Sequence, residues 1–514
     1  MLSIGWERIF AGFRDTGEGT RQQRLREALV AAIEDGRLSA GTRLPSSRTL
    51  ANLLRISRNT VVQALDQLVE SGHLTARLRS GLFVAQRDMA EPAETARPIA
   101  PAASESAWER SFAIQPSRLR HISKPADWHR YPFPFLFGQT DPSLFPTREW
   151  RESARATSSV GGVSLWASDR IDEDDPKLIE QLRAQVLPQR GIWARPEEVM
   201  ITLGAQQALS LVIRLFTGPS TVFGIEDPCY PDARHMAALL TPHLRLLRMD
   251  RHGAVADETL AGCDVVMLTP ARQCPTTVAM PLERQLEVLR VASGRGTVVI
   301  EDDYDGGLFD EGRASGCLRS HDPRVIHIGS FSKLIAPGLR IGYVVAPARV
   351  IEELRAVRRL ELRHPPLNNQ RTLANFIALG HYRAHRHRLG SVMVERARLI
   401  DRSLANDLPE LLCRRTPGST GAWLELPSHL TAAAVTARAR RDGVLIEPGD
   451  VFFADPGVQR SHLRLGFTSI PADRIEAGIS TLARLLHDAP GRADSRDRPP
   501  ADHPARIRSA HPGA

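Results

Sequence analysis

Lys333 lies in the run Gly329-Ser330-Phe331-Ser332-Lys333-Leu334-Ile335-Ala336-Pro337-Gly338-Leu339-Arg340-Ile341-Gly342-Tyr343, which is the most informative stretch of the chain. Of the 67 Lys and Arg residues only Lys124, Lys177 and Lys333 are lysines, so arginine serves almost everywhere that a positive charge suffices. Unlike arginine, a lysine can lose its proton and form a Schiff base. Because hydroxyl groups and a guanidinium suited to a phosphate flank Lys333, the run predicts a site for pyridoxal 5′-phosphate (PLP). A surface lysine on a loop is the plainer alternative.

Length and composition indicate a globular protein of several domains. A chain of 514 residues has room for about three domains. The sequence has no apolar run of the roughly 20 residues that a membrane helix needs, and no basic start followed by an apolar stretch. The five cysteines are scattered and never in Cys-x-x-Cys spacing, which is typical of a reducing compartment without structural zinc. We therefore expect a cytoplasmic protein with no membrane partner.

Composition divides the chain into four parts. Residues 1–87 hold thirteen arginines against eight acidic residues, so most of the net charge of +8 lies there. Residues 88–130 are rich in Ala, Pro, Ser and Glu without apolar periodicity and are predicted to be a flexible linker. Residues 131–487 alternate helix-period segments with short apolar strands, and we expect a smaller C-terminal subdomain from about residue 375. The tail 488–514 is predicted to be disordered.

The strands expected within 131–487 are apolar throughout, which favours a mainly parallel sheet covered by helices on both faces. The fold class predicted is therefore an α+β winged helix-turn-helix followed by an α/β domain with a small α+β subdomain. The expected strands are 199–202, 265–268, 297–300, 325–328 and 343–345.

The N-terminal part reads as a helix-turn-helix with a wing. An amphipathic helix is expected over 21–35, and Ser46 or Ser47 can cap a short helix that ends near residue 54. Ser57 can cap a second helix over 58–69, and a hairpin follows over 72–84. The first residues of the second helix would reach base edges while arginines hold phosphates. The alternative is a small helical bundle with a solvated basic face.

Further motifs in the large domain suit a phosphorylated cofactor. Glu301-Asp302-Asp303-Tyr304-Asp305 follows a strand, where a carboxylate can pair with a pyridinium nitrogen and a tyrosine with the ring hydroxyl. Gly204-Ala205-Gln206 opens a helix after a strand and can cradle a phosphate. Tyr230 can stack on the ring, and Arg464, inside an apolar strand, needs an anionic partner such as a ligand carboxylate. The alternatives are a solvated loop, a plain strand-to-helix turn and a core tyrosine.

Residues 36–84 resemble the GntR-type winged helix. The motifs are Gly-Arg-Leu-x-x-Gly-x-Arg-Leu-Pro-Ser-Ser-Arg, Ser-Arg-Asn-Thr-Val and Ser-Gly-x-Phe-Val. With Gly-Ala-Gln-Gln-Ala, Glu-Asp-Pro-x-Tyr-Pro, Glu-Asp-Asp-Tyr-Asp, the lysine run and Leu-Arg-Leu-Gly-Phe, nearly the whole chain resembles the MocR/GabR regulators, whose large domain is that of a fold-type I aminotransferase. The resemblance implies that DNA is contacted by Arg48, Arg58, Asn59, Thr60 and, in the wing, Gly81.

The resemblance also implies a domain-swapped homodimer that binds promoter DNA and PLP and senses an amino compound by imine exchange at Lys333. Asp302 would hold the pyridine nitrogen, Tyr304 the ring oxygen and Arg464 the effector carboxylate. The phosphate would be held by Ala205, Gln206, Ser330, Ser332 and Arg340. Two other functions stay open: a working aminotransferase with an accessory DNA-binding head, and a repressor whose large domain has lost PLP.

Several segments depart from the family's pattern. Residues 271–277 stand where the family has Ser-His-Gln-x-Pro-Thr-Gly. Residues 169–176 replace Tyr-Gly-x-Pro-x-Gly, and residues 306–308 replace Ser-Glu-Phe. The partner-subunit tyrosine that usually touches the phosphate is therefore expected to be absent, and we expect PLP binding without efficient transamination. The run of His381, His385 and His387 is predicted to be a solvated helix face and not a metal site. The sequence does not identify the effector, the promoter or the sign of regulation.

Overall fold

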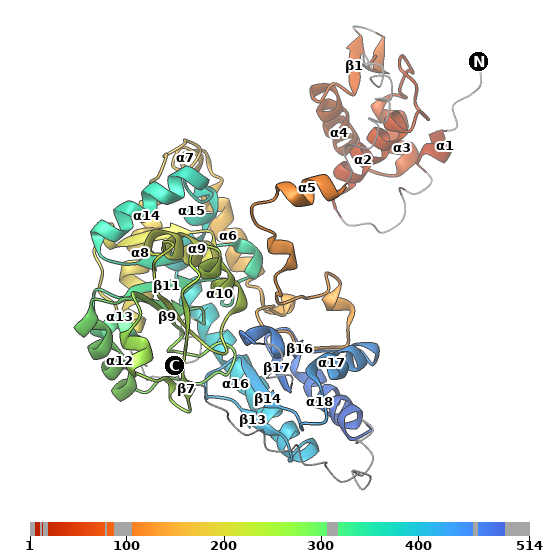
Figure 1. The fold of residues 1–514 in the computed structure, drawn as a ribbon. Helices are drawn as coiled ribbons and strands as arrows, with labels where there is room; N and C mark the ends of the chain where they lie inside the picture. Colours follow the sequence, from red (N-terminus) through yellow and green to blue (C-terminus); the bar gives the residue numbers. More distant parts are fainter. Residues whose placement is uncertain are drawn as a thin grey trace, which may run out of the picture. The chain divides into compact units, whose positions relative to one another are not determined.

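The computed structural model describes residues 6–10, 13, 19–77, 80–86, 105–305, 317–455 and 461–488. The chain divides into two compact units, Met1–Ala113 and Ile114–Ala514 (Figure 1). From residue 489 onward the predicted tail lies outside the described residues, as do the motif departures at 306–308.

The first unit is the predicted winged helix-turn-helix, and its helices begin where capping residues stand. The side chains of Thr20, Ser46 and Ser57 each accept a hydrogen bond from a backbone N–H in the first turn of the next helix. Leucines and valines at helical spacing then form a single core. The elements are α1 (Trp6–Ile9), α2 (Arg21–Glu34), α3 (Ser47–Leu54), α4 (Arg58–Glu70) and the antiparallel pair β1 (Leu74–Arg77) and β2 (Gly81–Val84).

The linker predicted over 88–130 differs from the structure at its C-terminal end. Residues from Ile114 onward belong to the second unit, and α5 (Glu105–Ser111) precedes them. Side chains of this stretch pack on the large domain, Ile122 against an aromatic cluster and Arg120 against backbone carbonyls. Composition suggested a linker because the few anchoring residues are spread among prolines and polar residues. The turns here are η2 (Pro116–Arg118) and η3 (Trp128–Arg130).

The large domain is built on a seven-stranded sheet in the order β4-β12-β11-β10-β9-β5-β6 (Figure 1). All neighbours are parallel except around β12, which runs antiparallel to β4 and β11, so the mainly parallel sheet is confirmed. The strands are β4 (Val199–Thr202), β5 (Phe223–Glu226), β6 (Leu244–Leu247), β9 (Val265–Leu268), β10 (Val298–Asp303), β11 (Ile326–Ser330) and β12 (Gly342–Val345).

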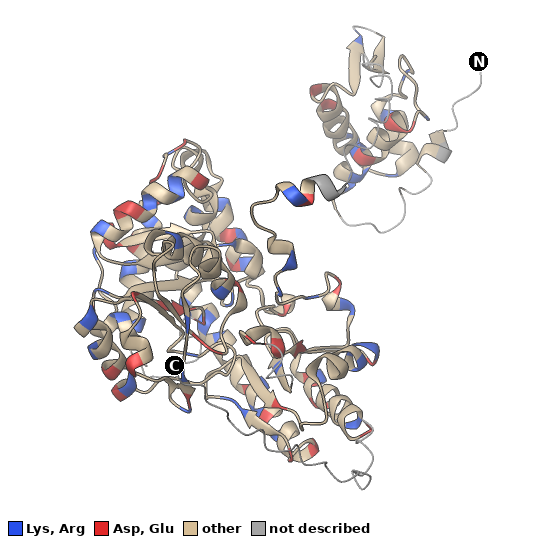
Figure 2. Cartoon of the chain, viewed as in Figure 1, with Lys and Arg blue, Asp and Glu red and all other residues tan. Residues whose placement is uncertain are grey.

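Helices cover both faces of this sheet, as the apolar strands require. One face packs on α9, α10 and α14, and the other on α12, α8 and α15. Over the outer helices α12 and α14 acidic and basic side chains alternate (Figure 2). The helices are α6 (Thr147–Thr157), α7 (Val160–Val163), α8 (Pro176–Gln181), α9 (Gly204–Phe216), α10 (Pro231–Ala238), α11 (Glu258–Ala261), α12 (Leu282–Arg295), α13 (Leu318–His321), α14 (Ala348–Glu361) and α15 (Leu367–Ala378).

The small subdomain pairs a four-stranded antiparallel sheet, β13-β14-β17-β16, with three helices. The start of the large domain also belongs to it, because β3 (Phe133–Pro134) pairs with β15 (Val444–Leu445). The glycine at 466 allows this approach, since a Cβ there would lie 2.4 Å from the backbone nitrogen of Phe137. The other elements are α16 (His381–Asp407), β13 (Leu412–Arg414), β14 (Gly421–Glu425), α17 (Ala432–Arg441), β16 (Glu447–Pro448), η9 (Asp450–Phe452), β17 (His462–Gly466) and α18 (Ala472–His487).

Candidate functional site

The site lies at the carboxyl edge of the parallel strands. β10 and β11 run parallel, with Asp302 opposite Ile328, and Lys333 follows the end of β11. Both strands extend beyond their predicted ends toward this edge. Because parallel strands end at the same edge of a sheet, residues that follow different strands meet there.

Lys333 is largely but not fully buried, and its amine lies among aromatic rings and one carboxylate. Its Nζ lies 3.0 Å from Oδ1 of Asp305 and 3.7 Å from the ring centroids of both Phe137 and Tyr304. Burial lowers the pKa of Lys333 to about 8, and Asp305 opposes that shift. A substantial share of the amine can therefore be neutral near physiological pH, as a nucleophilic lysine requires.

Asp302 has a carboxylate oxygen without a partner. Its neighbours are each bonded through at least one oxygen: Glu301 bonds to His327 at 2.9 Å, and Asp303 bonds to Arg190 at 2.8 Å through Oδ2 although its Oδ1 also lacks a hydrogen bond. Oδ1 of Asp302 accepts no hydrogen bond from the residues that the structure describes. Burial raises the pKa of Asp302 to about 7. A buried oxygen of this kind suits a donor on a ligand, such as a protonated ring nitrogen.

The two predicted tyrosines lie in one aromatic cluster beside Lys333. Tyr304 and Tyr230 both pack against buried rings that include Phe452 and Trp423. Burial raises the pKa of Tyr304, so its hydroxyl stays protonated. The Tyr230 hydroxyl bonds to Gln206 at 2.8 Å. That bond ties the predicted stacking residue to the predicted phosphate loop.

The predicted phosphate residues converge where α9 begins. The guanidinium of Arg340 donates to the carbonyl of Leu203 at 3.1 Å and lies against Gly204, where a Cβ would be 3.2 Å from Nη2. Gly342 brings β12 to the same turn, since a Cβ there would lie 2.8 Å from the Cα of Gly204. Ser330 is opposite Gly342 in the sheet.

Helix N-termini attract anions, so this turn is a suitable phosphate cradle. The backbone N–H groups of Ala205 and Gln206 belong to the first turn of α9. Ser332 lies beside Ser330, whose Oγ accepts from the Ser332 backbone at 3.2 Å. The structure therefore brings together every residue that the sequence proposed for this role.

Arg464 lies in β17 and is buried, with its guanidinium against a ring. The guanidinium carbon is 3.4 Å from the ring centroid of Phe137, and Nη1 is 3.9 Å from Oε2 of Glu447. Nε finds no hydrogen-bond acceptor within the described part of the chain. The predicted need for an anionic partner is therefore only loosely met by Glu447.

Three residues of the site were missed by sequence reasoning. Phe137 comes from the segment after β3, and its ring separates Arg464 from Lys333. Glu447 opens β16, and Asp305 faces Lys333. Glu447 and Asp305 carried a weak signal, a charge beside an apolar strand, whereas Phe137 carried none.

The departing segments have structural roles of their own. Asp174 forms a buried ion pair with Arg358 at 2.7 Å, so removing Asp174 would leave a buried charge on Arg358 unpaired. Thr277 stands where the family has glycine and has a φ of 64°, a left-handed conformation that costs a residue with a Cβ some energy. Cys274 is buried in the aromatic cluster near Tyr304.

The histidine run lies on α16 and differs from the prediction at one residue. His385 is buried, and its Nε2 lies 2.7 Å from the carbonyl oxygen of Leu334. The solvated face is thus wrong for His385, because α16 packs against the loop that carries Lys333. His381 pairs with Glu152 at 3.2 Å.

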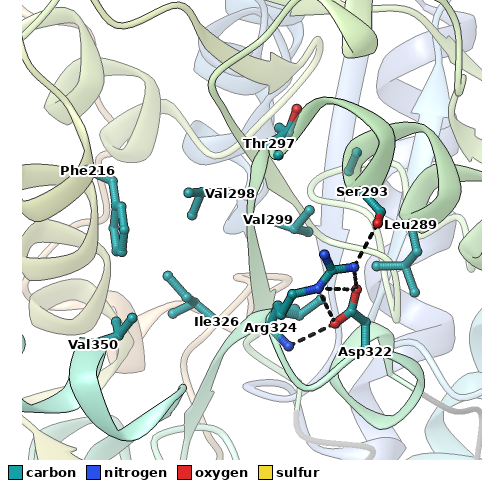
Figure 3. Close-up of a pocket in the computed structure, with 13 residues that line it drawn as sticks. Phe216, Leu289, Ser293, Thr297, Val298, Val299, Asp322, Arg324, Ile326 and Val350 are labelled. Carbon is teal, nitrogen blue, oxygen red and sulfur yellow. Dashed lines mark hydrogen bonds and ion pairs between the residues drawn. The ribbon is translucent and has the colours of Figure 1, made fainter.

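A pocket of about 220 Å³ lies at the opposite, amino edge of the strands (Figure 3). Its apolar wall includes Val298 and Ile326, and its charged residues satisfy each other. Arg324 bonds to Asp322 at 2.7 Å and to Ser293 at 2.9 Å. The two edges of the sheet therefore differ. At the lysine site Asp302 and Arg464 have buried atoms without a hydrogen-bond partner among the described residues, whereas at this pocket Arg324 and Asp322 neutralise each other.

The predicted DNA-contacting residues lie around the start of α4. Arg48 on α3 and Arg58 and Asn59 on α4 are exposed. Thr60 shares the capping bond of Ser57, with the two hydroxyl oxygens 2.7 Å apart. Gly81 opens the wing strand β2 with a φ of 106°. The arrangement presents one helix end and one hairpin, as a winged helix does.

Comparison with protein families gives two matches. Residues 21–84 match the model for bacterial regulatory proteins of the gntR family, and residues 172–478 match aminotransferase class I and II. No helix among the described residues is long and apolar enough to cross a membrane.

Two relatives match this chain over nearly its whole length. The transcriptional regulator TauR of Rhodobacter capsulatus is 37% identical over 91% of this chain and 97% of its own length. The probable rhizopine catabolism regulatory protein MocR of Rhizobium meliloti is 29% identical over 90% of this chain and 92% of its own.

A solved structure resembles the large domain. LysN, an α-aminoadipate aminotransferase from Thermus thermophilus complexed with N-(5′-phosphopyridoxyl)-L-leucine, has a TM-score of 0.66 and 30% identity, and the match covers 74% of this chain and 98% of that one.

Proposed function

Because the chain belongs to the MocR/GabR-type transcriptional regulators, a GntR-family winged helix joined to a fold-type I aminotransferase-like domain, we propose that it regulates a promoter in response to an amino compound. The winged helix would bind the promoter. The large domain would bind PLP and the effector, and two copies would form a domain-swapped homodimer in the cytoplasm.

PLP is the cofactor that the aminotransferase family implies, and the site fits it. The partnerless oxygen of Asp302 suits the ring nitrogen, and the turn before α9 suits a phosphate. When bound, PLP supplies a carbonyl that combines reversibly with amines. Tyr304 would donate to the ring oxygen and Tyr230 would cover the ring. The phosphate would be held by Ala205, Gln206, Ser330, Ser332 and Arg340.

The effector would use two groups at the site. Its amine would compete with the amine of Lys333, and its acid group would bind Arg464, whose guanidinium lacks a close partner. Regulation then requires that the effector has different affinities for the DNA-competent and DNA-incompetent arrangements.

The observation that carries this proposal is the buried amine of Lys333 beside a partnerless aspartate. Borohydride reduction of protein incubated with PLP should leave the cofactor on the peptide that contains Lys333, as detected by mass spectrometry. Lys333→Ala should carry none, while Lys177→Ala should be labelled like the wild type. Labelling that persists in Lys333→Ala would refute the assignment.

A working aminotransferase is the second candidate function. It is favoured by the 2-aminoadipate transaminase of Thermus thermophilus, which is 31% identical over 74% of this chain and 97% of its own length. The threonine at 277 and the ion pairs of 169–176 favour the regulator. Steady transamination at ordinary enzymatic rates, with promoter binding undetectable, would establish the enzyme instead.

A further inference from the structure

Residues 120–124, here called the strap, follow the DNA-binding unit in the chain and are fastened to the body of the second unit. Arg120 donates to the carbonyls of Asp450 at 3.2 Å and Phe453 at 3.3 Å, and its own carbonyl lies 2.9 Å from Nε2 of His235. Ile122 packs against the aromatic cluster that also contains Tyr304. The strap therefore touches the wall of the effector site.

Lys124, at the end of the strap, is one of three charges in a row. Its Nζ lies 3.3 Å from Oε1 of Glu447, and Oε2 of Glu447 lies 3.9 Å from Nη1 of Arg464. Glu447 and Arg464 are 2% and 3% exposed. One buried carboxylate thus stands between the arginine proposed for the effector and the only lysine of the strap.

Glu447 is poorly bonded in this position. Neither of its oxygens accepts a hydrogen bond from a described residue, and Nε of Arg464 likewise lacks an acceptor. Burying charges with loose partners is costly, so a better anion for Arg464 would be favoured. An acid group placed in bidentate contact with Arg464 is such an anion.

A second contact links the same three places. The Phe137 ring lies 3.4 Å from the Arg464 guanidinium carbon and 3.7 Å from Nζ of Lys333. The Phe137 backbone carbonyl accepts a hydrogen bond from Nζ of Lys124. Phe137 therefore contacts both Lys333 and Arg464 and also binds Lys124, so a movement of either cationic group can reach Lys124 through this one residue.

We propose that Glu447 is an internal competitor for the effector's acid group and that Lys124 transmits the outcome to the strap. An acid group on Arg464 displaces Glu447, which changes its contact with Lys124 and loosens the strap. Because Glu447 stays in the pocket as a negative charge, the site selects amino compounds with one acid group over those with two. The inference rests on the proposed function, since it requires an effector at Arg464.

The test compares Glu447→Gln and Lys124→Gln, with Lys177→Gln as the matched control. Lys177 bonds to Asn375 at 2.8 Å and lies outside this row of charges. The probes are glycine, β-alanine and γ-aminobutyrate, and their binding is followed by the absorbance of PLP-loaded protein. The rate of trypsin cleavage after Arg120, whose guanidinium donates to the carbonyls of Asp450 and Phe453, measures the attachment of the strap, and intact PLP loading confirms folding.

The two variants should change probe affinity in opposite directions. Glu447→Gln removes the competitor, so the best probe should bind more tightly by about threefold or more. In Lys124→Gln the carboxylate of Glu447 keeps Arg464 as its one cationic neighbour in the row and competes more strongly for it, so the same probe should bind more weakly. In both variants the ligand-free strap should be cleaved after Arg120 about tenfold faster or more than in wild type, while Lys177→Gln should match wild type.

Weaker probe binding by Glu447→Gln, or cleavage of its strap at the wild-type rate, would overturn the inference. If no probe binds the wild type although PLP is attached to Lys333, the proposed effector class fails instead. The rate of cleavage of ligand-free Glu447→Gln still decides whether Glu447 holds the strap.

Discussion

The arginines that the proposed function uses differ in burial between the two compact units. In the first unit Arg58 and Arg48 are exposed, and Arg37 pairs with Asp35 while about half of each side chain remains exposed. The second unit also has exposed arginines, such as Arg349, but Arg464 is buried and faces a carboxylate. Exposed arginines act through the long-range field that a nucleic acid responds to, whereas a buried arginine selects one specific anion. The arginines at the start of α4 therefore suit a polymer, and Arg464 suits a small molecule.

The largest expected effect is that of Lys333→Ala, which should abolish a function of the second unit alone. Lys333→Ala removes the only amine at the carboxyl edge of the strands among the described residues, so covalent attachment of PLP and the response of promoter binding to amino probes should be lost. Titration of a promoter fragment with and without γ-aminobutyrate measures the response, and Lys177→Ala should retain it. A response that survives in Lys333→Ala would break the division of roles.

Arg58→Ala should have the next largest effect, on DNA alone. Arg58 opens α4, and losing a base or phosphate contact there should weaken promoter binding by about 1–3 kcal/mol. Fluorescence anisotropy at fixed salt measures the affinity, and Arg37→Ala, in the turn after α2, is the control. Unchanged affinity in Arg58→Ala would mean that α4 is not the recognition helix, while altered PLP loading would show that the units are not independent.

The sequence predicted the first unit more completely than the site. Ser57 and one of the two serines proposed, Ser46, cap their helices through bonds to residues three positions on, so local patterns sufficed there. The lysine run and the acidic run were also found, because each follows its own strand. Phe137 and Glu447 reach Arg464 only through strand pairings between segments far apart in the chain.

The same argument explains the other differences. The strap was taken for linker because its anchors, Arg120 and Lys124, bind partners more than 300 residues away or a backbone carbonyl. His385 was taken for a solvated residue because its partner, the carbonyl of Leu334, belongs to another element. Burial of a polar group is a tertiary property, and helical spacing alone does not predict it.

Removing the carboxylate beside Lys333 should shift a pH profile. Asp305 raises the pKa of Lys333 against the effect of burial, which lowers it to about 8. Asp305→Asn should therefore lower that pKa further, so that attachment of PLP reaches its plateau at a lower pH than in wild type. The measurement is the rate of PLP attachment between pH 6 and 10, followed by absorbance, because only the neutral amine reacts. We expect the midpoint of this pH profile to move to lower pH by roughly one pH unit.

An unshifted profile in Asp305→Asn would mean that another group sets the charge of Lys333. The exposed acidic residue Asp66 on α4 offers a control, since Asp66→Asn should leave the profile unchanged. A shift in both variants would point to the net charge of the whole chain and not to the buried contact.

The smallest effect concerns the independence of the two units. The Ser57 hydroxyl accepts from the backbone N–H of Thr60 at 3.1 Å, and loss of such a cap costs about 1 kcal/mol. Ser57→Ala should therefore lower the unfolding temperature of the first unit only, as measured by calorimetry. Ser39→Ala, in the turn after α2, removes only an exposed contact with the Thr42 hydroxyl at 3.3 Å and should have less effect. If Ser57→Ala also shifts the transition of the second unit, the strap passes stability as well as ligand information between the units.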